Sequence, residues 1–438
     1  MTSPKENIRT DGPILANRAK KSAKRRGCLE FMSSLLLPLS LGVFTIVITF
    51  QQQSAAQQQR IEDRDAADLQ RAEDRNASRL QREQNKKEAE LLRKQEENLD
   101  KQRYENGRFD IYIKEMGGLL EKYGGSIKSS EVAATLARVK TLNIFRQLDS
   151  QKNIRIIRFL YEAKQLTDTP ENRSLDLSTA KLLDIDFRDI AVDERELYQL
   201  SLRGIFLLNA TFIGITMSNI DFSRIKFDTS NFSLAKIHDG NFSSAGFYNT
   251  SFASTSFSNT IFAETKFKNV NFSSTSFDTI EFSSVEFYNT SFASTSFSNA
   301  IFAETKFENV NFSFTTFDTI EFSGAKLENV YFPSNNIRDI NFKRSTLVNV
   351  DFSFSVFYNP DFSFASLSNV NFSHAVLFNA NFSYAIINDA DFSFAKLHKP
   401  IFFLPELKKV NFASTILSNV DCCITFFHEF IILSALQF

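Results

Sequence analysis

The residues that most often carry out chemistry in proteins are few and scattered in this sequence. The four histidines stand far apart, at His238, His374, His398 and His428. The three cysteines are Cys28, Cys422 and Cys423. None of these residues falls in a zinc-ligand or metalloprotease spacing, and three cysteines are too few for a disulfide framework. No GxSxG motif or phosphate-binding glycine loop occurs either. We therefore expect no metal, no cofactor and no enzymatic activity; an enzyme would need acids or bases to converge in a concave site.

Composition points to a repeated structure instead. The chain has 438 residues, of which 43% are hydrophobic, so it is long enough for more than one folded unit. It holds 49 phenylalanines but only 10 tyrosines and no tryptophan. A bias this large predicts a recurring phenylalanine position. The formal net charge of -1 is not that of a typical nucleic-acid-binding protein.

A period of five residues runs through the second half of the chain. From Phe212 onward, nearly every position numbered 2 or 7 in its last digit is Phe, Leu or Ile, and a small or β-branched residue stands two places before it. The register extends back to Leu177 and on to Phe427, with Arg195 at a position where a small residue is expected. A period of five fits neither a helix nor a plain strand, but it suits a short extended step followed by a corner.

Four such steps would close a coil of twenty residues. Residues 247–286 recur almost unchanged as 287–326, which inserts two whole coils without changing the register. Phenylalanines spaced twenty apart form two unbroken series, from Phe222 to Phe402 and from Phe212 to Phe412. We expect these rings to stack inside the coil, while the outer flanks are polar and uniform.

The N-terminal part divides into four further segments. Residues 1–27 form a basic tail, and 28–50 contain an uncharged apolar stretch over 31–50 that predicts a membrane-spanning helix in a lipid bilayer. A cleaved signal peptide is the alternative interpretation. The basic residues before this stretch would place the N-terminus in the cytoplasm and the repeats outside the cell or in a lumen.

Residues 51–108 form a polar stalk of helical composition. Leu69, Leu80 and Leu91 lie eleven apart, which fits weak self-association or a solitary helix. Residues 109–170 predict a small helical region, with a helix beginning at Ser130. Its apolar residues would cover the open end of the repeats; they are Val132, Leu136, Val139, Leu142, Phe145, Ile154, Ile157, Leu160 and Tyr161.

Two kinds of modification are chemically possible. Cys28 lies beside Arg25 and Arg26 at the predicted membrane boundary, where it would be a palmitoylation site or an unmodified thiol. Asn76 and Asn172 begin N-glycosylation sequons outside the repeats. The many Asn-Phe-Ser and Asn-Thr-Ser triplets inside the repeats are better explained by the repeat itself.

The pattern in "NVNFSSTSFDTIEF" and "NANFSYAIINDADF" resembles the pentapeptide-repeat family over about residues 175–427. Residues 135–166 look like the helical segment that precedes the repeats in membrane-anchored members. The resemblance implies a right-handed quadrilateral β-helix over 171–427, followed by an apolar C-terminal end at 428–438, and implies no activity. Some members mimic DNA as decoys for topoisomerases, but the acidic and basic side chains of these repeats are too nearly balanced for that role.

The sequence therefore predicts a single-pass membrane protein whose rod acts as a structural or protein-interaction scaffold. Its partners would be the bilayer, through residues 31–50, and an unknown protein on the rod, with no nucleic acid. A homodimer through the stalk or the C-terminal end is compatible with the pattern. Recognition of a repetitive surface, such as ice or polysaccharide, is the main alternative.

Overall fold

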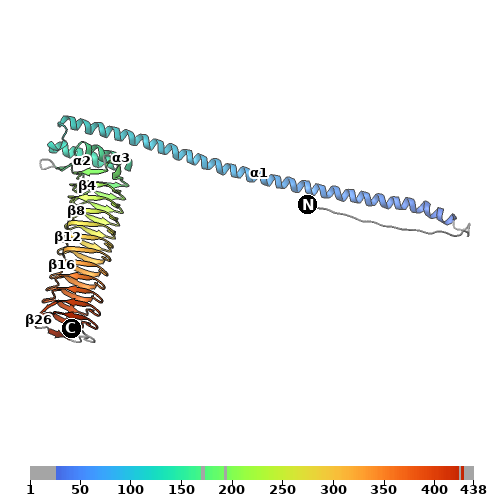
Figure 1. Cartoon of the computed structure of the whole chain (residues 1–438). Coiled ribbons are helices and arrows are strands. Elements are labelled where there is room, and N and C mark those ends of the chain that lie inside the picture. The colour runs from blue at the N-terminus through green and yellow to red at the C-terminus, as the bar shows by residue number, and fades with distance from the viewer. Residues whose placement is uncertain (1–25, 169–172, 192–194, 424–425, 429–438) are drawn as a thin grey trace, which may run out of the picture. The chain divides into compact units, whose positions relative to one another are not determined.

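The computed structural model describes residues 26–168, 173–191, 195–423 and 426–428, with side chains described between residues 41 and 421. The chain divides into two units, Met1–Leu99 and Asp100–Phe438. The first contains most of the helix α1 (Arg26–Lys122), which is 97 residues long. The last turns of α1 belong to the second unit, together with all other elements (Figure 1).

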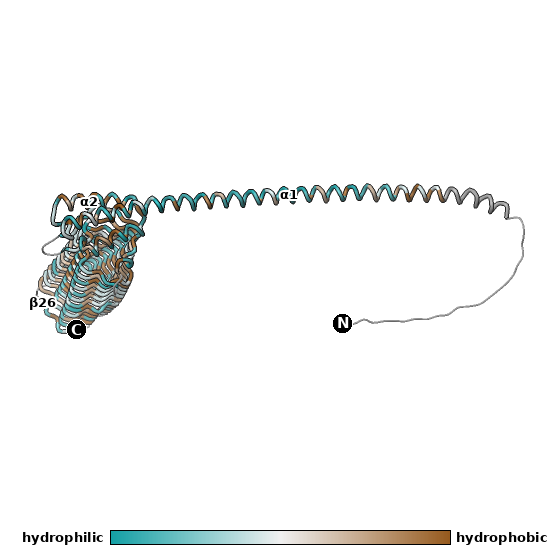
Figure 2. The backbone as a smooth tube through the Cα atoms, turned by 90° about the horizontal axis from the view of Figure 1, so that it is seen from above, coloured by the Kyte–Doolittle hydropathy of each residue, from teal (hydrophilic) through white to brown (hydrophobic). Residues whose placement is uncertain are grey.

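The polar stalk is helical, as the sequence predicted. Its part of α1 is mainly hydrophilic (Figure 2), and Leu69, Leu80 and Leu91 are exposed in the single chain. Within the described side chains, no helix combines the length and apolar character needed to cross a bilayer. The transmembrane helix predicted over 28–50 is therefore not supported by these residues; side chains up to residue 40, which include Cys28, lie outside them.

The helical region covers the first coil of the repeats. It comprises the end of α1, a 3₁₀ turn (Ile127–Ser129), α2 (Glu131–Phe145) and α3 (Ser150–Glu162). The predicted helix start is confirmed, because the Ser130 side chain accepts a hydrogen bond from the backbone N–H of Ala133. The Tyr161 hydroxyl donates to the carbonyl of Tyr198 at 3.0 Å and accepts from its N–H at 2.9 Å. The hydroxyl thus pairs with backbone groups at the edge of the first coil.

Only part of the predicted apolar face points inward. Ile154, Ile157 and Leu160 are buried, as expected for α3. In α2, Phe145 is buried as predicted, but the rest of the buried face is the neighbouring one, made of Ala133, Ala137, Thr141 and Ile144. Val132, Leu136 and Val139 are exposed, so their assignment to the core was wrong. The small alanines allow α2 to approach the end of α1, where the Tyr112 hydroxyl bonds that of Thr141 at 2.8 Å.

The repeats form a parallel β-solenoid with two long sheets on opposite walls. The 13-stranded sheet contains β1 (Lys181–Leu183), β3 (Phe206–Leu208), β5 (Lys226–Asp228), β7 (Gly246–Tyr248), β9 (Lys266–Lys268), β11 (Glu286–Tyr288), β13 (Lys306–Asn311), β15 (Lys326–Tyr331), β17 (Thr346–Asp351), β19 (Ser366–Asn371), β21 (Ile386–Asn388), β24 (Glu406–Lys408) and β27 (Phe426–His428). The 12-stranded sheet contains β2 (Glu196–Tyr198), β4 (Thr216–Ser218), β6 (Lys236–His238), β8 (Ser256–Ile261), β10 (Ser276–Glu281), β12 (Ser296–Ile301), β14 (Thr316–Glu321), β16 (Asn336–Asn341), β18 (Val356–Tyr358), β20 (Val376–Phe378), β22 (Lys396–His398) and β25 (Ile416–Ser418).

The other two walls are held by shorter pairings. One wall ends in the pair β23 (Ile401–Phe403) and β26 (Asp421–Cys423), and both walls carry rows of single parallel bridges such as Thr211 with Asn231. Partners lie 20 residues apart, as Phe277 and Phe297 do. The coil is therefore four-sided, with one repeat per wall, as the spacing predicted. Cys422 pairs with Phe402, which confirms that it stands at a central repeat position.

The interior is a stack of phenyl rings. Phe272 and Phe292 are fully buried, with ring centroids 4.8 Å apart and planes within 2°. Rings on neighbouring walls meet edge to face, as do Phe267 and Phe272 at 5.3 Å. Burial of large apolar side chains and these ring contacts together supply most of the rod's stability. Inward threonines are satisfied by the backbone: the Thr255 hydroxyl donates to the carbonyl of Phe232 at 2.8 Å.

The first coil departs from the predicted register. Leu182 pairs with Leu207, and Phe187 stacks on Phe212, so these partners are 25 residues apart. The chain makes one additional step here, through a 3₁₀ turn (Phe187–Asp189). Arg195 follows this step with a positive φ of 57° and is exposed. The extra step explains why an arginine stands where the strict period expects a small inward residue.

Candidate functional site: an aromatic surface on the repeat coils

One outward position of the repeat changes its chemistry along the rod. Residues numbered 4 in their last digit are the third residue of a tight turn and have a positive φ. Over 244–304 these residues are serine or glutamate. Over 354–394 all five are aromatic or imidazole rings: Phe354, Phe364, His374, Tyr384 and Phe394. The prediction of uniformly polar flanks was therefore wrong for these coils.

The rings stack along the rod on two opposite corners. His374 lies between Phe354, at 4.8 Å, and Phe394, at 5.0 Å, with all three planes within a few degrees of parallel. Ten residues away, and hence half a coil round, Phe364 stacks on Tyr384 at 4.8 Å. Phe354 and Phe394 remain 60% and 55% exposed. Stacking therefore orders the rings but leaves much of their surface in solvent.

The adjoining wall extends the first corner into a broader patch. Strands β18, β20 and β22 place Tyr358, Phe378 and His398 in a row, with 5.1 Å between the first two rings. Val356 and Val376 lie half-buried in the same strands, between this row and the corner. We call these eight residues the aromatic surface: Phe354, Val356, Tyr358, His374, Val376, Phe378, Phe394 and His398.

Backbone conformation does not explain the aromatic residues. Left-handed φ values are cheapest for Gly, Asn and Asp, and cost other residues about 1–2 kcal/mol. The corresponding turn position numbered 9 follows this rule, being mostly asparagine, as at Asn289, Asn309 and Asn329. Phe354 and Phe394, both with a φ of 58°, meet the same requirement with a less suitable side chain. Their side chains are therefore best explained by what they contact.

Charged groups border the aromatic surface, and one of them, Lys396, lies within it, in register with Val376. The Arg338 guanidinium lies over the Tyr358 ring, 5.3 Å from its centroid. Lys396 and Lys399 are exposed beside His398. Apolar centres with a charged rim are typical of protein-interaction surfaces. The exposed rings stand in the segments "DFSFSVF", "NFSHAVL" and "DFSFAKL". The period of five predicts which residues are buried, but it does not predict the residue type at the outward positions.

The histidines and acids do not converge on a reactive centre. Among the described residues, no group of three or more His, Cys, Asp or Glu could hold a metal ion. The Nδ1 atoms of His238 and His398 hydrogen-bond the serine hydroxyls of the next coil, Ser258 and Ser418. His374 belongs to the aromatic stack, and the His428 side chain lies outside the description. These contacts give the described histidines structural roles.

The repeat sequons also have a structural explanation. The Asn241 and Asn371 side-chain oxygens accept hydrogen bonds from the backbone N–H two residues later, at 3.0 and 2.9 Å. Another column is a ladder of amides, in which Asn309 donates to Asn289 at 3.3 Å. Outside the repeats, Asn76 is exposed on α1, and Asn172 lies outside the described residues. Glycosylation of either remains a prediction.

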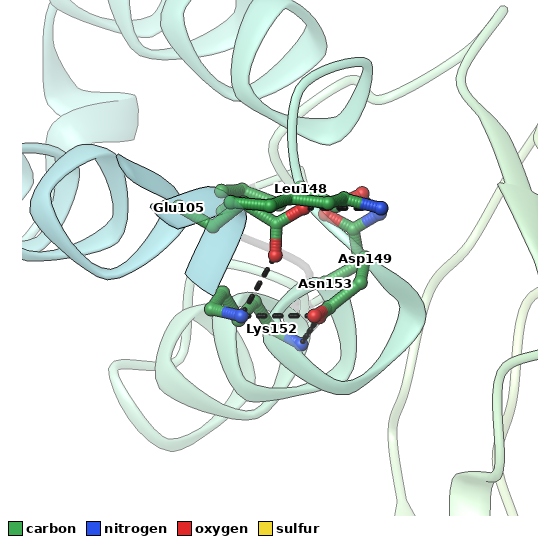
Figure 3. A network of polar contacts seen from close by, with 6 residues as sticks. Glu105, Leu148, Asp149, Lys152 and Asn153 are labelled. Atoms are coloured by element: carbon green, nitrogen blue, oxygen red, sulfur yellow. Dashed lines mark hydrogen bonds and ion pairs between the residues drawn. The ribbon is translucent and has the colours of Figure 1, made fainter. Parts of the chain in front are cut away.

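The most buried charges lie in the helical region and serve packing (Figure 3). The Lys152 ammonium contacts Glu105 at 2.9 Å and Asp149 at 2.8 Å, and Glu105 is only 4% exposed. Burial alone would lower the pKa of Lys152, but the hydrogen bonds to Asp149 and Glu105 raise it overall. Asp149 also caps α3 by accepting from the Lys152 backbone N–H. The cluster joins α1 to α3.

The repeat sequence matches two family models. One describes a pentapeptide repeat region and matches residues 275–352. The other describes pentapeptide repeats in eight copies and matches residues 241–278, 336–373 and 361–393. The solenoid is thus a pentapeptide-repeat domain, as the resemblance indicated. Neither model describes an enzyme family.

The solved structures that match this chain include HetL and QnrB1. HetL, a pentapeptide repeat protein involved in heterocyst differentiation regulation from the cyanobacterium Nostoc, is 15% identical, with a TM-score of 0.22 over 57% of this chain and 92% of its own. Full-length QnrB1, a plasmid-mediated fluoroquinolone resistance protein, is 15% identical, with a TM-score of 0.26 over 45% of this chain and 93% of its own. No curated protein sequence matches this chain.

Proposed function

We propose that this chain is a non-catalytic scaffold whose pentapeptide-repeat rod binds a protein partner through the aromatic surface. The observation that carries the proposal is the stack of exposed rings Phe354, His374 and Phe394, in turns that would accept asparagine at lower conformational cost. Exposed aromatic residues surrounded by charged groups suit a partner with apolar side chains at its centre.

The geometry of the rings disfavours the polysaccharide alternative. A sugar packs on the open face of an aromatic ring, but the faces of His374 are covered by Phe354 and Phe394. Ice recognition would require an outward array of threonine hydroxyls, whereas Thr255, Thr275 and Thr295 are buried and bond backbone carbonyls. Partners that approach the ring edges, such as apolar protein side chains, fit the surface better.

A DNA decoy is also less well supported. Such a rod needs closely spaced negative charge along its flank. Here the outward rows of these coils are rings and amides, and Asp351 and Asp391 accept hydrogen bonds from Asn371 and Asn411. A surface that binds a protein partner explains these residues better than a surface that mimics DNA does.

The test is affinity capture with the full chain and two variants. The first variant changes Phe354, His374 and Phe394, the three corner rings of the aromatic surface, to serine, the residue found at the same turn in other coils. The control variant changes Glu264 and Glu304 to serine at that turn position. We expect the wild type and the control variant to retain a partner that the first variant does not retain. The circular dichroism spectra of all three proteins should be the same. A partner bound equally by all three, or none bound by the wild type, would contradict the proposal.

Membrane attachment rests on the sequence of residues 1–64 and is proposed on that ground alone. The apolar stretch 31–50 and the basic residues before it support a cytoplasmic N-terminus and repeats outside the cell or in a lumen. Extraction of the expressed chain at alkaline pH, compared with a chain lacking residues 28–50, tests the attachment. Release of both into the soluble fraction would refute it.

Self-association through the stalk is a separate proposal. Leu69, Leu80 and Leu91 are exposed at a spacing that keeps them on one stripe of α1. The molar mass of a chain starting at residue 51, measured by light scattering, should fall from dimer to monomer when the three leucines are changed to glutamine. A monomer in both cases would remove this proposal.

A further inference from the structure

A small cavity opens beside the first coils of the rod, several coils from the aromatic surface. Its volume is about 360 Å³, and its walls come from residues 173–178, from the turn 201–204 and from Arg224 in the next coil. A volume of this size lies at the lower end of the range for ligand sites, roughly 300–1,000 Å³. The cavity can therefore hold a small molecule or one group of a larger one.

Three guanidinium groups line this cavity: those of Arg173, Arg203 and Arg224. Among the residues that the structure describes, only Arg203 of these three has a carboxylate partner, Asp221, at 3.2 Å from its Nε. Arg173 and Arg224 form no ion pair with any residue that the structure describes. Arg203 and Arg224 lie on successive coils, which are about 4.8 Å apart, so their like charges repel. An anion between them would relieve this repulsion.

The one carboxylate in the cavity wall is already engaged. Asp176 lies 3.0 Å from the Nε of Arg138, which reaches over from α2. Burial would raise the pKa of Asp176, but hydrogen bonds from Ser178 and the charge of Arg138 lower it overall. Asp176 is therefore held in its charged form with its own partner, and it does not neutralise Arg173 or Arg224.

Hydroxyl groups complete the polar lining. The Ser174 hydroxyl donates to that of Ser201 at 2.8 Å, and Ser201 is 2% exposed. The Ser178 hydroxyl also faces the cavity and accepts from Arg138 at 3.3 Å. Gly204 keeps the opposite wall close: a Cβ there would lie 3.0 Å from that of Ser178, and its φ of +66° suits glycine. Guanidinium and hydroxyl groups are the donors that bind oxyanions.

We propose that this cavity, which we call the arginine cavity, binds a phosphate monoester. The charged groups in and against it are Arg138, Arg173, Arg203, Arg224, Asp176 and Asp221, together with Asp168, which accepts from the Ser174 backbone N–H and interacts with Lys128. Lys128 balances Asp168, and the remaining four positive and two negative groups leave two positive charges. A phosphate monoester carries about −1.5 to −2 at neutral pH, and its oxygens match the fork geometry of guanidinium groups. A single carboxylate would neutralise only half of the surplus.

Isothermal titration of the full chain with inorganic phosphate and with phenyl phosphate tests the proposal. The variant changes Arg173 and Arg224 together to glutamine. The matched control is Arg344→Gln, because Arg344 occupies the same turn position as Arg224 six coils later, with a φ of 59° against 58°. We expect saturable binding that the double variant weakens at least about tenfold and the control leaves unchanged.

Further arms identify the source of the phosphate group. Vesicles of phosphatidylcholine with phosphatidic acid present a lipid monoester, whereas phenyl phosphate is soluble. Binding of the vesicles or of phenyl phosphate that is lost in the double variant but not in the control supports the proposal. Which of the two binds shows whether the ligand is a lipid or a soluble phosphate monoester. The proposal is overturned if neither phosphate nor the vesicles bind saturably, if the double variant binds as well as the wild type, if Arg344→Gln weakens binding equally, or if acetate binds as tightly.

Discussion

The cluster of Glu105, Lys152 and Asp149 allows a quantitative prediction about the helical region. Changing Lys152 to methionine keeps most of the side-chain stem but removes the ammonium group from Glu105, whose side chain is 5% exposed. An ionised carboxylate left in such a place costs about 3–5 kcal/mol. Asp149 is more exposed, at 38%, and can be solvated by water. The penalty therefore falls mainly on Glu105.

A second cation limits the size of this penalty. The Lys101 ammonium lies 3.8 Å from the Glu105 carboxylate and partly replaces the lost partner. We therefore expect Lys152→Met to destabilise the helical region by about 2–4 kcal/mol at pH 7.

Two further variants separate the charge effect from packing. Glu105→Gln should cost only about 1 kcal/mol, because Lys152 keeps Asp149 at 2.8 Å. In the double variant Glu105→Gln with Lys152→Met, no carboxylate remains at position 105, so the total loss of stability should be less than the sum of the losses in the single variants. The control is Arg158→Gln, whose pair with Glu162 is on the surface of α3 and should contribute less than about 1 kcal/mol.

Hydrogen exchange of the α3 amides is the suitable assay, because it reports opening of the helical region separately from unfolding of the rod. Lys152→Met should speed exchange about 30- to 1,000-fold at pH 7, after correction for the intrinsic rate. The reasoning is refuted if the α3 amides of Lys152→Met exchange no faster than those of Arg158→Gln.

Other predictions follow from the same structure. Phe292→Ala, in the middle of the buried ring stack, should cost about 3–5 kcal/mol in chemical unfolding, whereas a change of the exposed Phe314 to serine, as in the equivalent coil, should cost less than about 1 kcal/mol. Tyr161→Phe removes the hydroxyl that pairs with both backbone groups of Tyr198, and should raise amide exchange at that residue about tenfold without moving the unfolding midpoint of the rod. Burial raises the pKa of Tyr112, and hydrogen bonds to Asp149 and Glu105 outweigh burial and raise the pKa of Lys152. A group whose pKa is higher in the folded than in the unfolded state contributes its full stabilisation below the unfolded-state pKa. That stabilisation is lost as the pH rises through the folded-state pKa. The helical region should therefore open above about pH 10 while the rod persists, and simultaneous loss of both in circular dichroism would contradict this.

The repeat could be predicted from sequence because its buried positions repeat a single requirement. A large ring and a small residue recur on every wall, so the period of five fixes the coil, the register and the core together. The pairing of the first coil could not be predicted in this way, because the extra step before Arg195 lengthens the offset between paired residues from 20 to 25 without changing the period of five. The face of α2 was misassigned for a different reason: Ala133 and Ala137 are buried because they are small, and a search for large apolar residues selects Val132 and Leu136 instead.

The candidate sites were harder to predict than the fold. The aromatic surface consists of side chains separated by ten or twenty residues that meet only once the coil is closed. Arg173, Arg203 and Arg224 come together because the first coil and its extra step bring three segments to one place. Neither arrangement follows from local spacing, since both depend on contacts between coils.

Because the offset between coils is a uniform 20 residues, the length of this rod can change in steps of one whole coil. Because each coil presents the same pairing edge above and below, a gene segment encoding whole coils can be duplicated by unequal recombination without disturbing the fold. Residues 247–286 and 287–326 have the form of such an event, which would have lengthened the rod by two coils, about 9.6 Å. The copies then diverged mostly at outward positions, where Ser274 corresponds to Phe314, and at two small inward positions, where Thr260 and Val285 correspond to Ala300 and Ala325. Reach and surface chemistry can thus evolve independently of each other, with the stack of rings inside left unchanged.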